Sequence, residues 1–328
     1  MARIGVAAVE DEGIHVGVAL ADKASLTKLE DRPKLYQRPG SYNAKFIAKT
    51  VKGRLEEIDG PLDAIGISMF GQIEGTSVTG VPRPDWPTKM KPLDFAELFS
   101  GTRWAGLPLK VAHDSTTSAL AEYRAFQLHK NRSPGYFVRV RVGTGVGVGT
   151  LIPLGEETTR RARARIGDHP EAGHCKVTRC QGDDKIAFTC PRHPEGCVEG
   201  AISERAILMR CGVDSLNKIG PRDPVWEFVA DYLGQLCDHI TNLIRPELIV
   251  ISGGTMVDKN KEPRHELFDQ IRAAFEEKNG GYPHYKTMTA SDYISEPECD
   301  PEYAGFLGVA ELGRRELFQK VERIRIAS

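Results

Sequence analysis

Four potential metal ligands lie within one short stretch of the chain. His174, Cys190, His193 and Cys197 form the pattern H-x15-C-x2-H-x3-C. Thiolate sulfur and imidazole nitrogen are ligands that zinc prefers, and short spacings bring ligand pairs to one ion while a longer arm folds into a lobe. Four protein ligands fill a tetrahedral zinc and leave no position for water, so the pattern favours a structural zinc over a catalytic one.

Two acidic residues flank these ligands at close range. Glu171 lies three residues before His174, and Glu199 lies two residues after Cys197. If the stretch borders a cleft, both carboxylates would be carried into it; the alternative is solvated surface charge. A histidine that binds metal through one ring nitrogen can donate a hydrogen bond from the other, so His174 could serve a metal and a polar ligand together.

Asp114 is the strongest candidate for a general base. It follows a short strand-like segment and precedes the helix-like run STTSALAEY. A carboxylate at the end of a strand projects from the sheet edge, where a base can face a cleft. The alternative is a helix N-cap, because aspartate is among the best capping residues. The residues alone leave both roles open.

Two glycine-rich turns have the form of anion-binding turns. The stretch GTGVGVG, residues 143–149, contains residues without a Cβ atom, so backbone N–H groups can approach an anion closely. A glycine pair follows the apolar segment 247–252, a position where ligands collect in α/β folds. The alternative for each is a tight turn that needs glycine. The residues concerned are Gly143, Thr144, Gly145, Gly147, Gly253 and Gly254.

The overall composition argues against several classes of function. The 328 residues carry 44 basic and 45 acidic side chains, and a formal net charge of −1 offers no footprint for nucleic acid or a membrane surface. No run approaches the roughly 18 apolar residues of a membrane helix. The apolar run 4–9 is too short for a secretion signal, so we expect a cytoplasmic protein whose 7 cysteines are reduced.

The order of the expected elements is that of an α/β protein with mixed sheets. We expect a hairpin of strands 3–9 and 14–20, then a helix over 43–58 with Asn43 as its cap. From about residue 70 to 108 we expect long loops with a short helix. The other expected strands are 63–68, 109–112, 135–142, 145–152 and 247–252, and the other helices start after Asp114, start at Asp223-Pro224, and cover 262–277 and 302–318.

Taken together, these segments resemble the ROK family of sugar kinases and repressors, most closely its fructokinase-like branch. The resemblance covers nearly the whole chain, and HPEAGH with the cysteine–histidine segment is its most specific part. The segments that carry it are IGISMFGQIE (65–74), VPRPDW (81–86), LPLKVAHDSTTSALAE (107–122), VRVGTGVGVG (140–149), HPEAGH (169–174), CPRHPEGCVEGAIS (190–203), YLGQL (232–236), ELIVISGGTM (247–256) and AGFLGVAELG (304–313).

The resemblance implies an actin- and hexokinase-like (ribonuclease-H-like) fold with two domains and an interdomain cleft. The first domain would be residues 1–121, with the helix at about 302–318 packing back on it. The second would be residues 122–328 and would carry a zinc-binding lobe at about 169–200. Related kinases suggest a homodimer.

The same resemblance implies ATP-dependent phosphorylation of a hexose, fructose or a related sugar. Asp114 would be the catalytic base, and Mg²⁺ with the backbone at 143–147 would hold the triphosphate. Gly253-Gly254 would form the turn on the adenosine side. The family's sugar contacts match Glu171, His174 and Glu199. His113, immediately before Asp114, departs from the family pattern, and we expect it to contact the sugar as well.

The sequence departs from the family pattern at several positions. The family's first phosphate loop is replaced by AAVEDEG, residues 7–13, whose acids would repel a triphosphate. Thr116 stands where the family has asparagine, and Cys197 lies one residue further from His193 than in the fructokinase branch. The alternative function is therefore a degenerate, sugar-binding protein without kinase activity. A repressor is disfavoured because the chain starts directly on the first strand.

Overall fold

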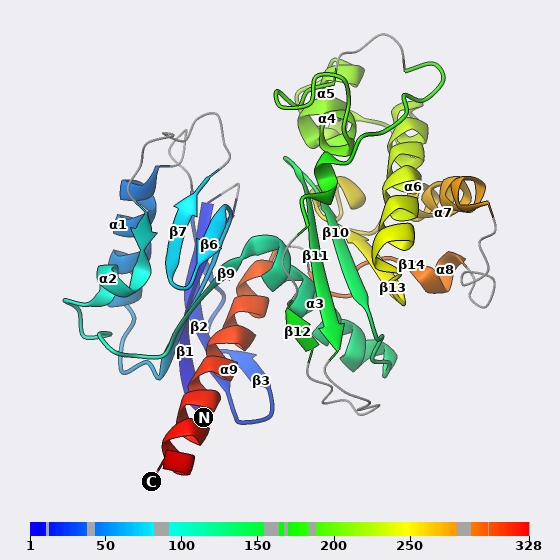
Figure 1. Ribbon diagram of the computed structural model, residues 1–328. Helices are drawn as coiled ribbons and strands as arrows, with labels where there is room; N and C mark the ends of the chain where they lie inside the picture. The colour runs from blue at the N-terminus through cyan, green and yellow to red at the C-terminus, as the bar shows by residue number, and fades with distance from the viewer. Residues whose placement is uncertain are drawn as a thin grey trace. The chain divides into compact units, whose positions relative to one another are not determined.

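The computed structural model describes residues 1–10, 13–37, 43–81, 92–153, 164–166, 170–183, 188–280, 290–300 and 302–327. The chain divides into two compact units, drawn in Figure 1. The first consists of Met1–Ala121 with Glu302–Ser328, and the second of Glu122–Pro301. The chain therefore leaves the first unit once and returns to it for its last helix.

A mixed sheet forms the centre of the first unit. Strand β1 pairs antiparallel with β2 and parallel with β5, and β9 continues the sheet parallel to β5. The predicted hairpin at the N-terminus is thus confirmed. The strand order is β3 (Leu26–Leu29), β2 (Gly13–Ala21), β1 (Ala2–Val9), β5 (Ala64–Met69) and β9 (Leu109–His113), and β4 (Lys34–Gln37) also pairs with β2.

Alternate residues of β1 pack into two different cores, as the strand period of two requires. Ala7 and Val9 share a core with helix α1 (Ala44–Glu56), which buries Ile47, Val51 and Leu55. The even-numbered residues of β1 instead pack with Phe306 and Val309 of helix α9 (Ala304–Ala327). Helix α1 confirms the expectation for 43–58, including Asn43, whose side chain accepts a hydrogen bond from the Phe46 amide at 2.8 Å.

Glycines allow α9 to approach the sheet and helix α3 (Asp114–Lys130) very closely. A Cβ atom on Gly66 of β5 would lie 2.4 Å from the carbonyl oxygen of Val309. A Cβ atom on Gly308 would lie 1.7 Å from the carbonyl oxygen of Thr117, in the first turns of α3. In both cases the nearest atom belongs to the backbone, so a change of side-chain rotamer cannot relieve the overlap. The close packing of α9 against β5 and α3 thus depends on Gly66 and Gly308.

The segment after β5 differs from the expected loops. Its short helix is confirmed as α2 (Phe95–Phe99), but three strands form a small sheet that the sequence pattern missed: β6 (Gln72–Glu74), β7 (Ser77–Gly80) and β8 (Leu93–Asp94). Strands this short carry too few alternating residues to give a pattern. Residues 82–91, which include Trp86, lie outside the described residues.

The second unit is built on another mixed sheet. Strands β10 and β13 are parallel, and β10 and β11 form an antiparallel hairpin, which confirms the strands expected at 135–142, 145–152 and 247–252. The order is β12 (Ala164–Ile166), β11 (Val146–Pro153), β10 (Phe137–Val142), β13 (Leu248–Ser252) and β14 (Ile294–Ser295). Each unit therefore combines an antiparallel hairpin with following parallel strands, and the predicted α/β class with mixed sheets is confirmed.

Helices α6 (Val225–Ile244) and α7 (His265–Asn279) pack against each other and supply the core of this unit. The starts of both agree with expectation to within a few residues. The shorter helices and 3-10 turns of this unit were not predicted from the sequence. They are α4 (Val198–Ile202), α5 (Glu204–Cys211), α8 (Ala290–Tyr293), η1 (Ala172–His174), η2 (Leu216–Lys218) and η3 (Gly254–Met256). Among the helices that the structure describes, none combines the length and the apolar character needed to cross a bilayer.

Substitution of Gly308 tests the close seating of α9. We expect Gly308→Ala to lower the free energy of unfolding by about 2–3 kcal/mol, because its methyl group would overlap the Thr117 carbonyl. At Gly53, in α1, no atom lies within 4 Å of the position that a Cβ atom would take, so Gly53→Ala should be neutral or stabilise by up to about 1 kcal/mol. Urea denaturation of both variants measures the difference, and equal effects would contradict this account.

Candidate active site and metal centre

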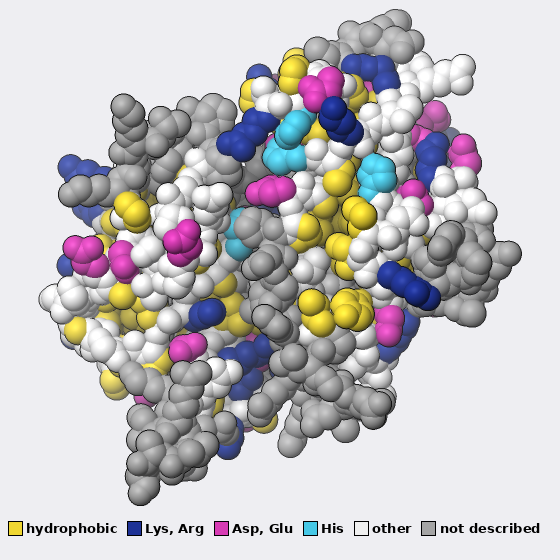
Figure 2. Space-filling view, in the orientation of Figure 1, with side chains coloured by type: hydrophobic (Ala, Val, Ile, Leu, Met, Phe, Trp, Pro, Cys, Tyr) yellow, Lys and Arg dark blue, Asp and Glu magenta, His cyan; other side chains and the backbone are white. Residues whose placement is uncertain are grey.

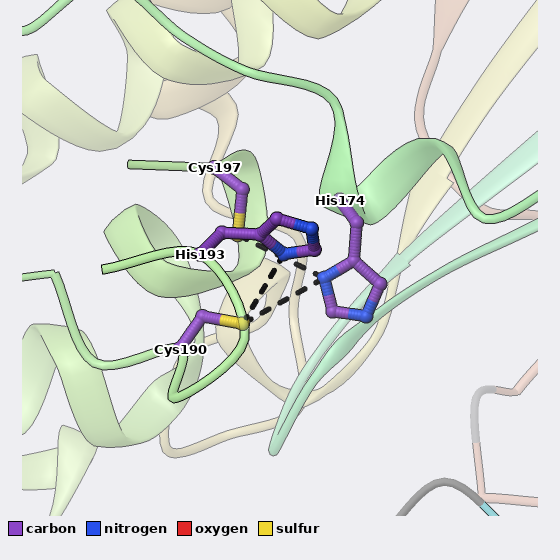
Figure 3. A group of neighbouring side chains, drawn as sticks. All are labelled: His174, Cys190, His193 and Cys197. Atoms are coloured by element: carbon purple, nitrogen blue, oxygen red, sulfur yellow. Dashed lines mark hydrogen bonds between the residues drawn. The ribbon is translucent and has the colours of Figure 1, made fainter. Parts of the chain in front are cut away.

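Two sulfur and two nitrogen atoms converge in the second unit, as Figure 3 shows. One donor atom from each of His174, Cys190, His193 and Cys197 lies within 4.8 Å of all the others. The Cys190 Sγ atom is 3.8 Å from Nδ1 of His174 and 3.6 Å from Nδ1 of His193. Tetrahedral zinc with ordinary bond lengths would separate S and N ligands by about 3.6 Å. The side chains therefore fit a single zinc ion with little rearrangement.

The surroundings of the two thiols also suit a metal. Cys190 and Cys197 are buried, and burial together with the neighbouring Cys190 raises the pKa of the Cys197 thiol to about 12. Two buried thiolates side by side need a compensating positive charge, which a divalent cation supplies. His174 and His193 remain partly exposed, and the space-filling view shows histidine rings at the surface of this unit beside acidic side chains (Figure 2).

Short local elements position the four ligands. His174 ends the η1 turn, and Cys197 is the N-cap of α4, where its sulfur accepts a hydrogen bond from the Gly200 amide at 3.3 Å. The Val198 amide donates to the Cys175 carbonyl at 3.1 Å, which joins the two ligand-bearing segments directly. The neighbouring Cys175 itself contributes no atom to the cluster. We call residues 170–183 and 188–204, which include these ligands, the metal lobe.

A buried ionic network links Asp183 of the metal lobe to helices α5 and α6. Asp183 receives two hydrogen bonds from Arg210, at 2.9 and 2.8 Å, and one from the hydroxyl of Tyr232 at 2.7 Å. Burial raises the pKa of Asp183, but the bonds from Arg210 and Tyr232 outweigh it and leave that pKa below its usual value. The carboxylate is therefore charged at neutral pH and holds α5 and α6 to this segment.

The two glycine turns lie together at one end of the second sheet. The parallel register pairs Arg141 of β10 with Ser252 of β13, so both strands end at the same edge. A Cβ atom on Gly253, where φ is +107°, would lie 2.2 Å from the carbonyl oxygen of Val142. Glycine is therefore required there by both backbone conformation and contact. The structure thus brings the turn at Gly143 and the turn at Gly253 side by side.

The first glycine turn is held by the metal lobe. Within the turn, the Gly143 amide donates to the Gly145 carbonyl at 2.9 Å. From outside, the Glu199 carboxylate accepts from the Val146 amide at 3.1 Å, and the Glu204 amide donates to the Gly143 carbonyl at 2.7 Å. Glu199, predicted as a sugar contact, therefore also touches the turn that was predicted to bind phosphate.

An open pocket of about 590 Å³ adjoins this turn. Thr144 lines it together with residues of α5, among them Arg205, Leu208 and the half-exposed Met209. The α5 residues of this pocket were not predicted from the sequence. No motif marks them, because apolar side chains with one acidic and one basic neighbour, Glu204 and Arg205, are also what an ordinary surface helix presents.

In the first unit, Asp114 stands at the junction of β9 and α3, as expected. Its Oδ1 atom accepts a hydrogen bond from the Ser115 amide at 2.7 Å and lies 3.0 Å from Nδ1 of His113. About 17% of the Asp114 side chain and 16% of the His113 side chain are exposed. Asp114 is the first residue of α3, whereas an N-cap precedes the first helical residue and accepts from an amide two or three residues further on. The bond from Ser115 is therefore not an N-cap bond, and the partly exposed carboxylate stays a candidate base.

The remaining predicted residues fall into separate parts of the structure. Glu171 is exposed and precedes η1, and its carbonyl accepts from the His174 amide at 2.9 Å. At the segment predicted to replace a phosphate loop, Glu10 and Gly13 exchange backbone hydrogen bonds at 2.9 and 3.3 Å where β1 pairs with β2. Asp11 and Glu12, its other two acids, lie outside the described residues.

A family model described as the ROK family matches residues 7–292. The chain belongs to the ROK family. The resemblance stated from the sequence motifs is therefore confirmed.

Curated relatives and solved structures agree with the family. The chain is 29% identical to a fructokinase of Pediococcus pentosaceus over 241 residues, which cover 71% of this chain and 74% of that protein. It is 28% identical to a fructokinase of Streptococcus mutans serotype c over 292 residues, 86% of each. A ROK family glucokinase from Streptomyces griseus, solved with glucose and AMPPNP, has a TM-score of 0.65 at 19% identity, covering 95% of this chain and 99% of that one. This likeness confirms the hexokinase-like fold.

Removal of one thiolate tests the metal centre of this ROK protein. We expect Cys190→Ser to abolish the binding of one zinc per chain and to lower the melting temperature by roughly 5–10 °C, because the lobe loses its central ligand. Cys175→Ser is the matched control, since Cys175 adjoins a ligand but stands outside the cluster. Emission spectroscopy of the purified variants measures the zinc. Stoichiometric zinc in Cys190→Ser would contradict the assignment.

Proposed function

We propose that this protein is an ATP-dependent hexose kinase that phosphorylates fructose or a related, specialised sugar. The observation that carries the proposal is Asp114, a partly exposed carboxylate at the carboxyl end of β9, in a chain of the ROK family. The two curated relatives are named as fructokinases. Their names support a ketohexose as the first substrate to test.

On the sugar side, the proposal uses His113, Glu171, His174 and Glu199. Carboxylates accept hydrogen bonds from sugar hydroxyls, and an imidazole N–H donates to a hydroxyl oxygen. The Nδ1 atom of His174 faces the cysteine sulfurs, so its Nε2 atom is the one left to meet a ligand (Figure 3). Zinc bound at the cluster would fix this tautomer and ring orientation.

On the nucleotide side, the proposal assigns the phosphates of MgATP to the turn at Gly143–Gly147 and the adenosine to the neighbouring turn at Gly253-Gly254. The adjoining pocket supports this arrangement, because it begins at Thr144 and continues along Leu208 and Met209. A flat aromatic base suits an apolar wall of this kind. Arg205 on the same wall can donate to a phosphate or ribose oxygen, and Glu204 beside it can accept from a ribose hydroxyl.

The reaction would be a direct transfer between the two substrates. Asp114 removes the proton from a sugar hydroxyl while that oxygen bonds to the γ-phosphorus, and the bond from phosphorus to the β–γ bridging oxygen breaks to release ADP. Proton removal contributes roughly 10²–10⁴-fold to the rate. Mg²⁺, bound with the nucleotide, supplies charge neutralisation. Zinc contributes no chemistry in this scheme, because four protein ligands leave it no open position.

A second candidate function, sugar binding without phosphoryl transfer, is favoured by one specific observation. Where the family has its first phosphate loop, Glu10 begins a closed hairpin, and its carboxylate lies near Gly305 of α9. A carboxylate there opposes the approach of a triphosphate.

Replacement of Asp114 by asparagine tests the catalytic base. We expect Asp114→Asn to reduce kcat by about 10²–10⁴-fold with little change in sugar affinity, because the amide keeps the shape of the carboxylate but cannot take a proton. The control is Asp94→Asn, which changes a second aspartate in the first unit that accepts hydrogen bonds at a helix start. A coupled ADP assay measures the rates. Full activity in Asp114→Asn would refute this role.

Calorimetric titration separates the two candidate functions. We expect the wild-type protein to bind both a hexose and MgATP and to turn them over when both are present. Fructose, glucose, mannose and amino sugars should be compared with several nucleotide donors, since the donor is also part of the proposal. Sugar binding without nucleotide binding or turnover at millimolar nucleotide would favour the second candidate. The proposal further places the enzyme in the cytoplasm as a homodimer.

A further inference from the structure

The glycine turn at Gly143 and the metal lobe are joined by a side chain, Glu199. The Glu199 Oε2 atom accepts a hydrogen bond from the Val146 amide at 3.1 Å. Val146 begins β11, immediately after the turn, and is buried. A hydrogen bond that a buried backbone amide donates to a charged acceptor is stronger than one between neutral groups.

Gly145 makes this contact possible. A Cβ atom on Gly145 would lie 2.7 Å from the same Glu199 Oε2 atom. That separation is shorter than van der Waals contact, so any side chain there would displace the carboxylate. Gly145 therefore allows Glu199 to adopt this rotamer and reach the Val146 amide.

Two backbone contacts reinforce the hold on the turn from the same lobe. The Glu204 amide donates to the Gly143 carbonyl at 2.7 Å. Gly173, adjacent to the ligand His174, approaches the Val146 carbonyl so closely that a Cβ atom there would lie 2.0 Å from it. The turn is thus contacted from η1, from α4 and from the start of α5.

The metal cluster lies at the base of this arrangement. Cys197 is both a predicted ligand and the N-cap of α4, and Glu199 occupies the first turn of that helix. A helix of 5 residues has little stability of its own, so its position depends on the core into which Val198, Ala201 and Ile202 pack and on how its first residue is fixed. A metal ion bound to the Cys197 sulfur would add a constraint on the direction of the Glu199 carboxylate.

We propose that Glu199 is a positioning residue that holds the phosphate-binding turn at Gly143–Val146 in register with the metal lobe. The inference rests on the proposed kinase function. It gives Glu199 a second role, toward the nucleotide, besides its predicted sugar contact. Because the Val146 amide donates its hydrogen bond to Glu199, this amide is not available to a phosphate, and other amides of the turn would face the phosphate instead.

Hydrogen exchange at the Val146 amide tests the contact without requiring catalysis. In the zinc-loaded protein, we expect Glu199→Ala to speed exchange at this amide by about tenfold or more, the equivalent of one lost charge-assisted bond. Glu199→Gln should stay within about threefold of wild type, because its amide oxygen can accept the same bond. Glu195→Ala, which removes an exposed carboxylate of the same lobe paired with Lys176 at 3.4 Å, is the matched control and should change nothing.

Two further measurements make the test specific. Gly145→Ala leaves the Glu199 carboxylate intact but displaces it, so it should speed Val146 exchange as Glu199→Ala does. In kinetics, Glu199→Ala should raise the KM for the nucleotide by about tenfold and Glu199→Gln by much less, whereas a role confined to the sugar would move the sugar KM alone.

The outcomes separate this inference from the kinase function itself. Val146 exchange within about twofold of wild type in Glu199→Ala would overturn the inference, and so would a nucleotide KM that stays constant while the sugar KM rises. A wild-type protein that phosphorylates no sugar would refute the proposed function, and the exchange data would still decide whether Glu199 holds the turn.

Discussion

Four side chains of the second unit converge on one point, and the arrangement of its candidate site depends on this convergence. They are His174, Cys190, His193 and Cys197. The metal lobe contains a three-residue turn and a five-residue helix, and neither element is long enough to be stable alone. The candidate ligands come from three places along the chain, so one ion bound there would close the lobe. The lobe carries His174, proposed as a sugar contact, and reaches the glycine turn through Glu199. Under this proposal, a metal without an open coordination position would still affect the groups that hold the substrates.

The topology of each sheet accounts for where the other candidate residues lie. In each unit an antiparallel hairpin precedes parallel strands, and chemistry-bearing residues follow the carboxyl ends of the parallel ones. Asp114 follows β9, and Gly253 follows β13. This is the position at which α/β sheets collect ligands, because neighbouring strands end at one edge and their loops diverge. A single topological rule thus places a carboxylate in one unit and a glycine turn in the other.

Much of this arrangement could be predicted from the sequence, for identifiable reasons. The convergence of the candidate ligands, His174 and Cys197 among them, could be predicted because sulfur and imidazole at fixed spacing have few other uses. Helix α6 could be predicted because its apolar residues recur at helical spacing. The small sheet β6–β8 was missed, since strands of two to four residues give no usable period. The contact of Glu199 with Val146 was missed because it joins residues 53 positions apart, and nothing in either local pattern reports it.

The packing of the last helix bears on the order in which the chain can fold. The second unit is one continuous stretch of chain, residues 122–301, whereas the first needs residues from both ends. Ile4, Val6 and Ala8 of β1 share their core with Phe306, Val309 and Ala310 of α9. During synthesis, domains fold as their residues emerge. The core between β1 and α9 can therefore form only after residues 304–310 have been synthesised, later than the whole of the second unit.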